Sequence, residues 1–203
     1  EHDLTGTNLS DSILLKTNIS GIDLRHIPLA NADFRFANLS ESKLLDSLLV
    51  NNNFDHAALN NINFAGKDLS GSSFQEAELD GSDMQNTNLS ETDFIQVDLT
   101  KIKNKSLAGA DLSEASFAHS NLSGVNLAGT ILHTTNFWKA DLSGVDFTVT
   151  DVITDGLSFI EANLSNSNFE GVNLSPKVKY VEVFQNNAHL KNLPHDQLVK
   201  NLF

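Results

Sequence analysis

The sequence contains no cysteine, and its 13 Lys and Arg residues are half as numerous as its 26 Asp and Glu residues. Without cysteine there can be no disulfide bond, thiolate nucleophile or thiolate metal ligand. The formal net charge of −13 makes nucleic acid and anionic membranes poor partners for the surface as a whole. No apolar run approaches the ~20 residues that span a bilayer, so we expect no membrane insertion. The lack of cysteine tilts the expected location slightly toward an extracytoplasmic one.

What the sequence does contain is a large apolar residue at every fifth position. The series runs unbroken from Leu4 to Leu99, resumes from Leu107 to Val152, and ends with Phe159 to Leu174. The period slips by three residues within 101–105 and by two near 154–156. Neither the 3.6-residue period of an α-helix nor the two-residue period of a β-strand produces this spacing. The chain is therefore a succession of five-residue units, each with a large apolar residue at its centre.

The other positions of the unit have their own composition. Two residues before the centre the side chain is mostly small, and one residue before it Asp or Asn dominates, as in Ala37-Asn38-Leu39. Ten of the 11 glycines fall two residues after a centre, for example Gly66 and Gly124. Glycine supplies the positive φ that many turns require. This pattern predicts a tightly coiled ribbon that turns a corner every five residues, with large and small side chains inward and Asp or Asn outward.

The pattern resembles that of the pentapeptide-repeat family, A-(D/N)-L-X-X. Here it reads Ala-Asn-Leu at 37–39 and 162–164, and Ala-Asp-Leu at 110–112 and 140–142. The resemblance covers residues 2–176 or so. It implies an all-β fold, the right-handed quadrilateral parallel β-helix, in which four units make one coil. It also implies one candidate function, DNA mimicry, because some relatives inhibit or protect DNA gyrase by imitating duplex DNA.

The sequence supports a coil of four units independently. If both slips leave the coil count intact, every fourth centre falls in one column that is phenylalanine throughout, and we call it the phenylalanine column: Phe34, Phe54, Phe74, Phe94, Phe117, Phe137 and Phe159. The column one step further along the chain, from Ile19 to Leu164, contains no phenylalanine. We therefore interpret both slips as local outpouchings in a rod of about 8–9 coils, roughly 40 Å long at the spacing of β-strands.

Two regions are expected. Residues 1–176 form the β-helix, and residues 177–203 differ in composition and form a C-terminal cap. Residues 178–184 are predicted as a strand, and a short amphipathic helix follows Pro194. Such a cap would cover the edge that the last coil exposes.

The sequence offers little for catalysis. It shows no nucleophile–base pair, phosphate-binding loop or paired acids, so we predict no catalytic residues, no cofactor and no enzyme activity. One candidate metal site consists of Glu78, Asp80 and Asp98, which a coil of four units places on one side, where three carboxylates could bind Ca²⁺ weakly. The alternative is that these acids only belong to the outward position of the repeat.

Two surface features are candidates for binding a protein. One is a row of apolar residues just after the phenylalanine column, namely Ile95, Ala118, Trp138 and Ile160. An exposed apolar row that holds the only Trp is a candidate contact surface, unless the C-terminal strand folds back over it. The other is the basic slip containing Lys101 and Lys103, which is either an ordinary solvated bulge or a contact for an acidic partner.

We therefore predict a non-catalytic structural or interaction module that presents a side of its rod to a protein partner or to a second copy in a two-fold dimer. DNA mimicry is the alternative. Residues 1–174 carry 24 acids and 9 bases, a balance of −15 that favours mimicry. The acids are spread evenly, five or six to a side, which argues against it.

Overall fold

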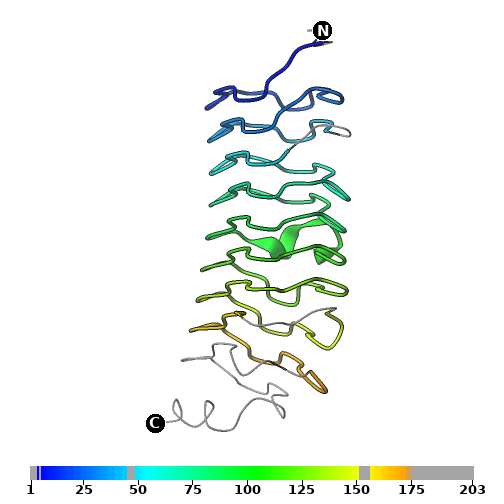
Figure 1. The fold of residues 1–203 in the computed structure, drawn as a ribbon, viewed down its shortest axis with the longest axis vertical. Coiled ribbons are helices and arrows are strands. Elements are labelled where there is room, and N and C mark those ends of the chain that lie inside the picture. Colours follow the sequence, from blue (N-terminus) through cyan, green and yellow to red (C-terminus); the bar gives the residue numbers. More distant parts are fainter. Residues whose placement is uncertain (1–3, 5, 45–48, 151–155, 173, 175–203) are drawn as a thin grey trace.

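The computed structural model describes residues 4, 6–44, 49–150, 156–172 and 174. The chain winds into flat coils stacked along one axis (Figure 1). Isolated parallel bridges join equivalent positions in successive coils, such as Asn38 and Ala58. Among the described residues, the only helices are two short 3-10 turns, η1 (Leu99–Lys101) and η2 (Lys103–Lys105). They are the green ribbons about midway along the stack in Figure 1.

The two slips change the bridge spacing without breaking the columns. Asn88 pairs with Asp111, three positions beyond the regular spacing, and the regular spacing returns where Ser106 pairs with Asn126. Asn136 pairs with Ser158, two positions beyond the regular spacing. The two increments equal the lengths of the slips, so the predicted outpouchings are confirmed. The first lies at η2, while residues 151–155 of the second lie outside the described residues.

The core consists of the central residues, stacked in four columns. Successive rings of the phenylalanine column are nearly parallel, and their centroids lie 4.7–5.6 Å apart. Every member of this column is fully buried. In the N-terminal coil, Leu9, Leu14 and Ile19 are only half-buried, because no described coil packs against their open side. Each coil therefore depends on both neighbours for burial of its apolar side chains.

The Asp or Asn before each centre caps the turn that follows. The side-chain oxygen accepts a hydrogen bond from the backbone N–H two residues later, as in Asn38 to Ser40 at 3.0 Å and Asp93 to Ile95 at 2.9 Å. This is the Asx-turn geometry that Asp and Asn favour. The composition of this position thus follows from turn chemistry as well as from exposure.

Each corner is a β-turn with a left-handed residue two positions after the centre. The backbone N–H three positions after the centre donates to the central carbonyl, as Ala37 does to Phe34 at 2.9 Å. The left-handed residue is Gly at some corners, but Phe36, His56 and Glu76 also hold φ between 55° and 59°. Bulky and charged side chains therefore project from some corners, whereas a corner glycine has no side chain.

Candidate interaction surface

One long corner of the rod collects most of the exposed aromatic side chains. It consists of the residues one and two positions after each centre of the phenylalanine column, together with the corresponding residues after Leu14, and we call it the aromatic edge. Its first row is Leu15, Arg35, Asp55, Gln75, Ile95, Ala118, Trp138 and Ile160, and its second row is Lys16, Phe36, His56, Glu76, Gln96, His119, Lys139 and Glu161. Backbone hydrogen bonds link the rows between coils, as from Glu76 N–H to the Ile95 carbonyl at 3.0 Å.

Trp138 is exposed but held in one orientation. Its side-chain Nε1–H donates to Glu161 Oε1 at 3.1 Å, and Lys139 Nζ lies 4.8 Å from the indole centroid. Lys139 also pairs with Glu161 at 3.3 Å, and the His119 ring meets the indole edge-on at 4.8 Å. The hydrogen bond from Trp138 lowers the pKa of Glu161, and Lys139 lowers it further, so the carboxylate stays ionised. Trp138 keeps 38% of its surface exposed within this cluster.

The rest of the predicted apolar row is less exposed than the sequence suggests. Ala118 is buried, and Ile95 and Ile160 are half-buried. Coils only ~4.8 Å apart allow neighbouring side chains to cover one another. The row is therefore not a continuous exposed strip, and Trp138 is its exposed member. The strand that could fold back over it falls within residues 177–203, which lie outside the described residues.

A second aromatic cluster lies on the same edge and was not anticipated. Phe36 is 51% exposed and stacks on His56 with ring centroids 4.5 Å apart. Lys16 Nζ lies 5.7 Å from the Phe36 centroid, and His56 Nδ1 lies 3.5 Å from Glu76 Oε2. The available signal was an aromatic residue at a corner position that glycine often fills. A search restricted to the row of Trp138 could not find it.

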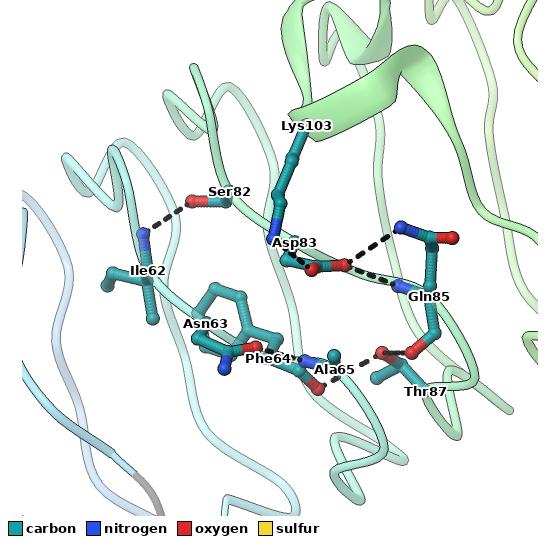
Figure 2. A network of polar contacts seen from close by, with 9 residues as sticks. All are labelled: Ile62, Asn63, Phe64, Ala65, Ser82, Asp83, Gln85, Thr87 and Lys103. Atoms are coloured by element: carbon teal, nitrogen blue, oxygen red, sulfur yellow. Dashed lines mark hydrogen bonds and ion pairs between the residues drawn. The ribbon is translucent and has the colours of Figure 1, made fainter.

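The lysines of the basic slip pair with acids of the same chain, and Figure 2 shows the contact of Lys103 with Asp83. Lys103 Nζ lies 2.8 Å from Asp83 Oδ2, and Asp83 Oδ1 accepts a hydrogen bond from the Gln85 N–H at 3.2 Å. Burial raises the pKa of Asp83, but the Lys103 and Gln85 contacts outweigh it and bring the pKa below its usual value. Lys101 Nζ lies 3.7 Å from Asp80. Two of the lysines predicted to attract an acidic partner are thus partly neutralised by their own chain.

The three candidate metal ligands are not brought together. Glu78 accepts a hydrogen bond from Asn60, Asp80 faces Lys101, and Asp98 caps the N–H of Thr100. Across the described part of the chain, no three His, Asp or Glu side chains are grouped so that they could hold a metal ion. The side chains of this candidate site instead serve turns and ion pairs. No helix among the described residues is long and apolar enough to cross a membrane.

The stacked five-residue units define a quadrilateral β-helix, and a family comparison agrees. The family model for pentapeptide repeats matches eight copies, over residues 29–66, 63–100, 110–148 and 155–175. The chain belongs to the pentapeptide repeat family, and its fold is the right-handed quadrilateral β-helix of that family.

Solved structures of this fold are similar over most of the chain. Trypsin-treated QnrB1, a plasmid-mediated fluoroquinolone resistance protein, is 19% identical with a TM-score of 0.46, and the match covers 89% of this chain and 90% of that one. HetL, a pentapeptide repeat protein involved in heterocyst differentiation regulation in the cyanobacterium Nostoc sp. strain PCC 7120, is 26% identical with a TM-score of 0.28. That match covers 91% of this chain and 74% of HetL. A comparison with curated proteins found no match.

Proposed function

We propose that this chain is a non-catalytic protein-interaction module that binds a protein partner through the aromatic edge, with Trp138 as the main contact. The observation that carries the proposal is that Trp138 is exposed yet already oriented by Glu161 and Lys139. An aromatic side chain fixed before binding loses little conformational freedom on association. Trp is also prominent among residues that dominate binding energy at protein interfaces.

The β-helix supplies a rigid support for this contact. The backbone of Trp138 is fixed on both sides, since its N–H donates to Asn136 Oδ1 at 3.1 Å and its carbonyl accepts from His119 N–H at 2.8 Å. The residues beneath it, Phe137 and Ala140, are fully buried or nearly so. A partner would therefore meet a preformed surface. The filled interior, in turn, gives no support to an enzyme site, which usually occupies a concave pocket.

We expect Trp138→Asp to abolish capture of the partner while the fold remains intact, because the side chain points outward. The measurement is affinity capture from an extract of the source cells, followed by binding of the purified candidate. Ala65→Asp is the matched control, since Ala65 is exposed at the same turn position on another side of the coil. Circular dichroism and thermal melting should match the wild type for both variants. If Trp138→Asp captures the same proteins as Ala65→Asp does, Trp138 is not the contact.

DNA mimicry receives less support from the contacts of the acids. Asp23 and Asp33 are paired with Arg25 and Arg35, and these contacts lower the pKa of both carboxyls. Asp83 is paired with Lys103. Many of the remaining Asp side chains have one oxygen committed to a turn, as in Asp68 and Asp141. A DNA mimic needs carboxylates that are free to contact a cationic groove. The Asp side chains named above are instead engaged in ion pairs and turn hydrogen bonds within the chain.

A further inference from the structure

We infer that the partner of the aromatic edge is a second copy of this chain, packed antiparallel so that the two edges face each other about a two-fold axis. The axis passes between the coil of Gln75 and the coil of Ile95. This inference rests on the proposed function and names the partner and its register. It follows from the order of side chains along the eight coils of the edge.

The two ends of the edge are complementary when one copy is reversed. The first coil presents Leu15 and Lys16, and the eighth presents Ile160 and Glu161. A two-fold axis across the rod places first row against first row and second row against second row. Leu15 then faces Ile160 of the other copy, and Lys16 faces Glu161. Leu15 is 41% exposed and Lys16 is exposed, so both are available for contact.

The next coils inward match cations with aromatic rings. The second coil carries Arg35 and Phe36, and the seventh carries Trp138 and Lys139. In the antiparallel arrangement Arg35 faces the indole of Trp138, and Lys139 faces Phe36. Cations near aromatic faces are attracted by the ring quadrupole. All four side chains are exposed in the single chain, and Lys139 already lies 4.8 Å from the Trp138 centroid.

The central coils complete the match without opposing like charges. Asp55 and His56 face Ala118 and His119, while Gln75 and Glu76 face Ile95 and Gln96; the positions on the single chain are known from the bridges between coils. A parallel two-fold dimer would instead set each coil against its own copy. Lys16 would then face Leu15, and Glu161 would face Ile160, with no opposite charge at either end. Arg35 with Phe36 and Lys139 with Trp138 would pair in either arrangement, so it is the charges at the two ends that favour the antiparallel register.

The expected association is weak. Eight coils at the spacing of β-strands give an edge about 34 Å long, and it is only two side chains wide. Such a strip buries far less than the ~800 Å² per partner of a standard interface. Isologous contact makes each residue count twice, since Lys16 of one copy meets Glu161 of the other at both ends. The dimer should therefore form at high protein concentration and respond strongly to charge reversal.

The test is sedimentation velocity of the full chain at concentrations up to about 1 mM, which reaches dissociation constants in the weak range. We expect Lys16→Glu alone and Glu161→Lys alone each to raise the dissociation constant at least about tenfold, because each sets like charges together at both ends. An equimolar mixture of the two variants should associate more tightly than either variant alone, since their heterodimer again has opposite charges at both ends; it need not reach the wild type, because Glu161→Lys also removes the acceptor of the Trp138 Nε1–H. The chain carrying both reversals should likewise associate more tightly than either single variant.

Three results would overturn the inference: a wild type that stays monomeric, single reversals without effect, or a mixture that associates no more tightly than either variant alone. Glu161→Gln keeps an acceptor for the Trp138 Nε1–H, so it separates loss of charge from loss of that hydrogen bond. If a reversal unfolds the chain, Lys16→Gln and Glu161→Gln replace it. Their combination should then weaken the dimer no more than either one alone. A monomeric wild type that still loses partner capture on Trp138→Asp would refute the dimer and leave the proposed function standing.

Discussion

Replacing Phe94 with alanine is expected to lower the free energy of unfolding by about 3–5 kcal/mol, the usual range for truncating a buried phenylalanine. The ring is fully buried, with the Phe74 centroid at 4.7 Å on one side and the Phe117 centroid at 5.1 Å on the other. Neighbouring coils hold those rings in place through backbone bonds, so the cavity cannot collapse easily. Urea denaturation followed by circular dichroism measures the change.

The adjacent outward residue is the control. Asp93→Asn keeps the side-chain oxygen that accepts the Ile95 N–H, and Asn occupies the same position in the coils of Asn53 and Asn136. Burial raises the pKa of Asp93, so ionisation is less favourable in the folded chain than in the unfolded chain. The folded state is thus destabilised as the pH rises past the unfolded value of ~3.9. Asp93→Asn should therefore be neutral or stabilising at pH 7. Equal losses for Phe94→Ala and Asp93→Asn would contradict the inward and outward assignment.

Gly71→Ala is expected to cost distinctly more stability than Gly66→Ala. Both glycines are left-handed, with φ of 68° and 70°. An alanine Cβ at position 71 would lie 2.2 Å from Asn51 Oδ1 in the preceding coil, whereas no described atom lies within 4 Å of a Cβ at position 66. Each variant bears the left-handed cost of ~1–2 kcal/mol. Gly71→Ala adds the cost of turning the exposed Asn51 amide away from the new Cβ, ~0.5–1.5 kcal/mol for a side chain held off its preferred rotamer.

The clash itself can be removed from the other side. The double variant Asn51→Ala/Gly71→Ala should lose little more stability than the double variant Asn51→Ala/Gly66→Ala. The reason is that the Asn51 amide, which meets the new Cβ at position 71, is absent from both. Chemical denaturation of the two single glycine variants and the two double variants measures these differences. The same pairing of Asn over Gly recurs at Asn61 with Gly81 and at Asn86 with Gly109. If Gly71→Ala and Gly66→Ala melt alike, the Asn51 amide turns aside at no measurable cost and the expected penalty is wrong.

The fold could be read from the sequence because each coil packs only on its neighbours. The five-residue spacing of apolar centres and the phenylalanine at every fourth centre define the columns. The length of each slip is the amount by which the bridge spacing across it exceeds the regular spacing. The choice between Gly and Asn at a corner was harder to read. Gly71 makes sense only once Asn51 is known to lie beside it, and that relation is set by the neighbouring coil.

The candidate site could be predicted only in part, because the repeat places few constraints on outward side chains. Trp138 was a candidate on sequence alone, but its hydrogen bond to Glu161 joins two coils across the second slip and depends on the length of that slip. The burial of Ala118 and the stacking of Phe36 on His56 likewise arise between coils. The Asx caps explain why aspartate is abundant: its side chain accepts a backbone hydrogen bond at the turn. A count of charges alone would attribute the same residues to a binding surface.

Engineered disulfides test the central claim, that the columns continue through the first slip. The chain has no cysteine of its own, so each introduced pair can be followed without background. The reference pair is Ser123→Cys with Ser143→Cys, whose hydroxyls lie 3.0 Å apart in adjacent coils. The test pair is Ser90→Cys with Ser113→Cys, which spans the slip, and there the Glu91 N–H donates to the Ser113 carbonyl at 2.8 Å.

The measurement is the extent of intramolecular disulfide formation under mild oxidation, determined by mass spectrometry of proteolytic peptides. Adjacent coils place such cysteines within the ~4.4–6.8 Å Cα separation that a disulfide needs. Ser90→Cys with Ser123→Cys, on different sides of the coil, is the negative pair. We expect the 90–113 pair to close as completely as the 123–143 pair, and the 90–123 pair to stay reduced. A 90–113 pair that stays reduced while the 123–143 pair closes would show that the slip breaks the columns.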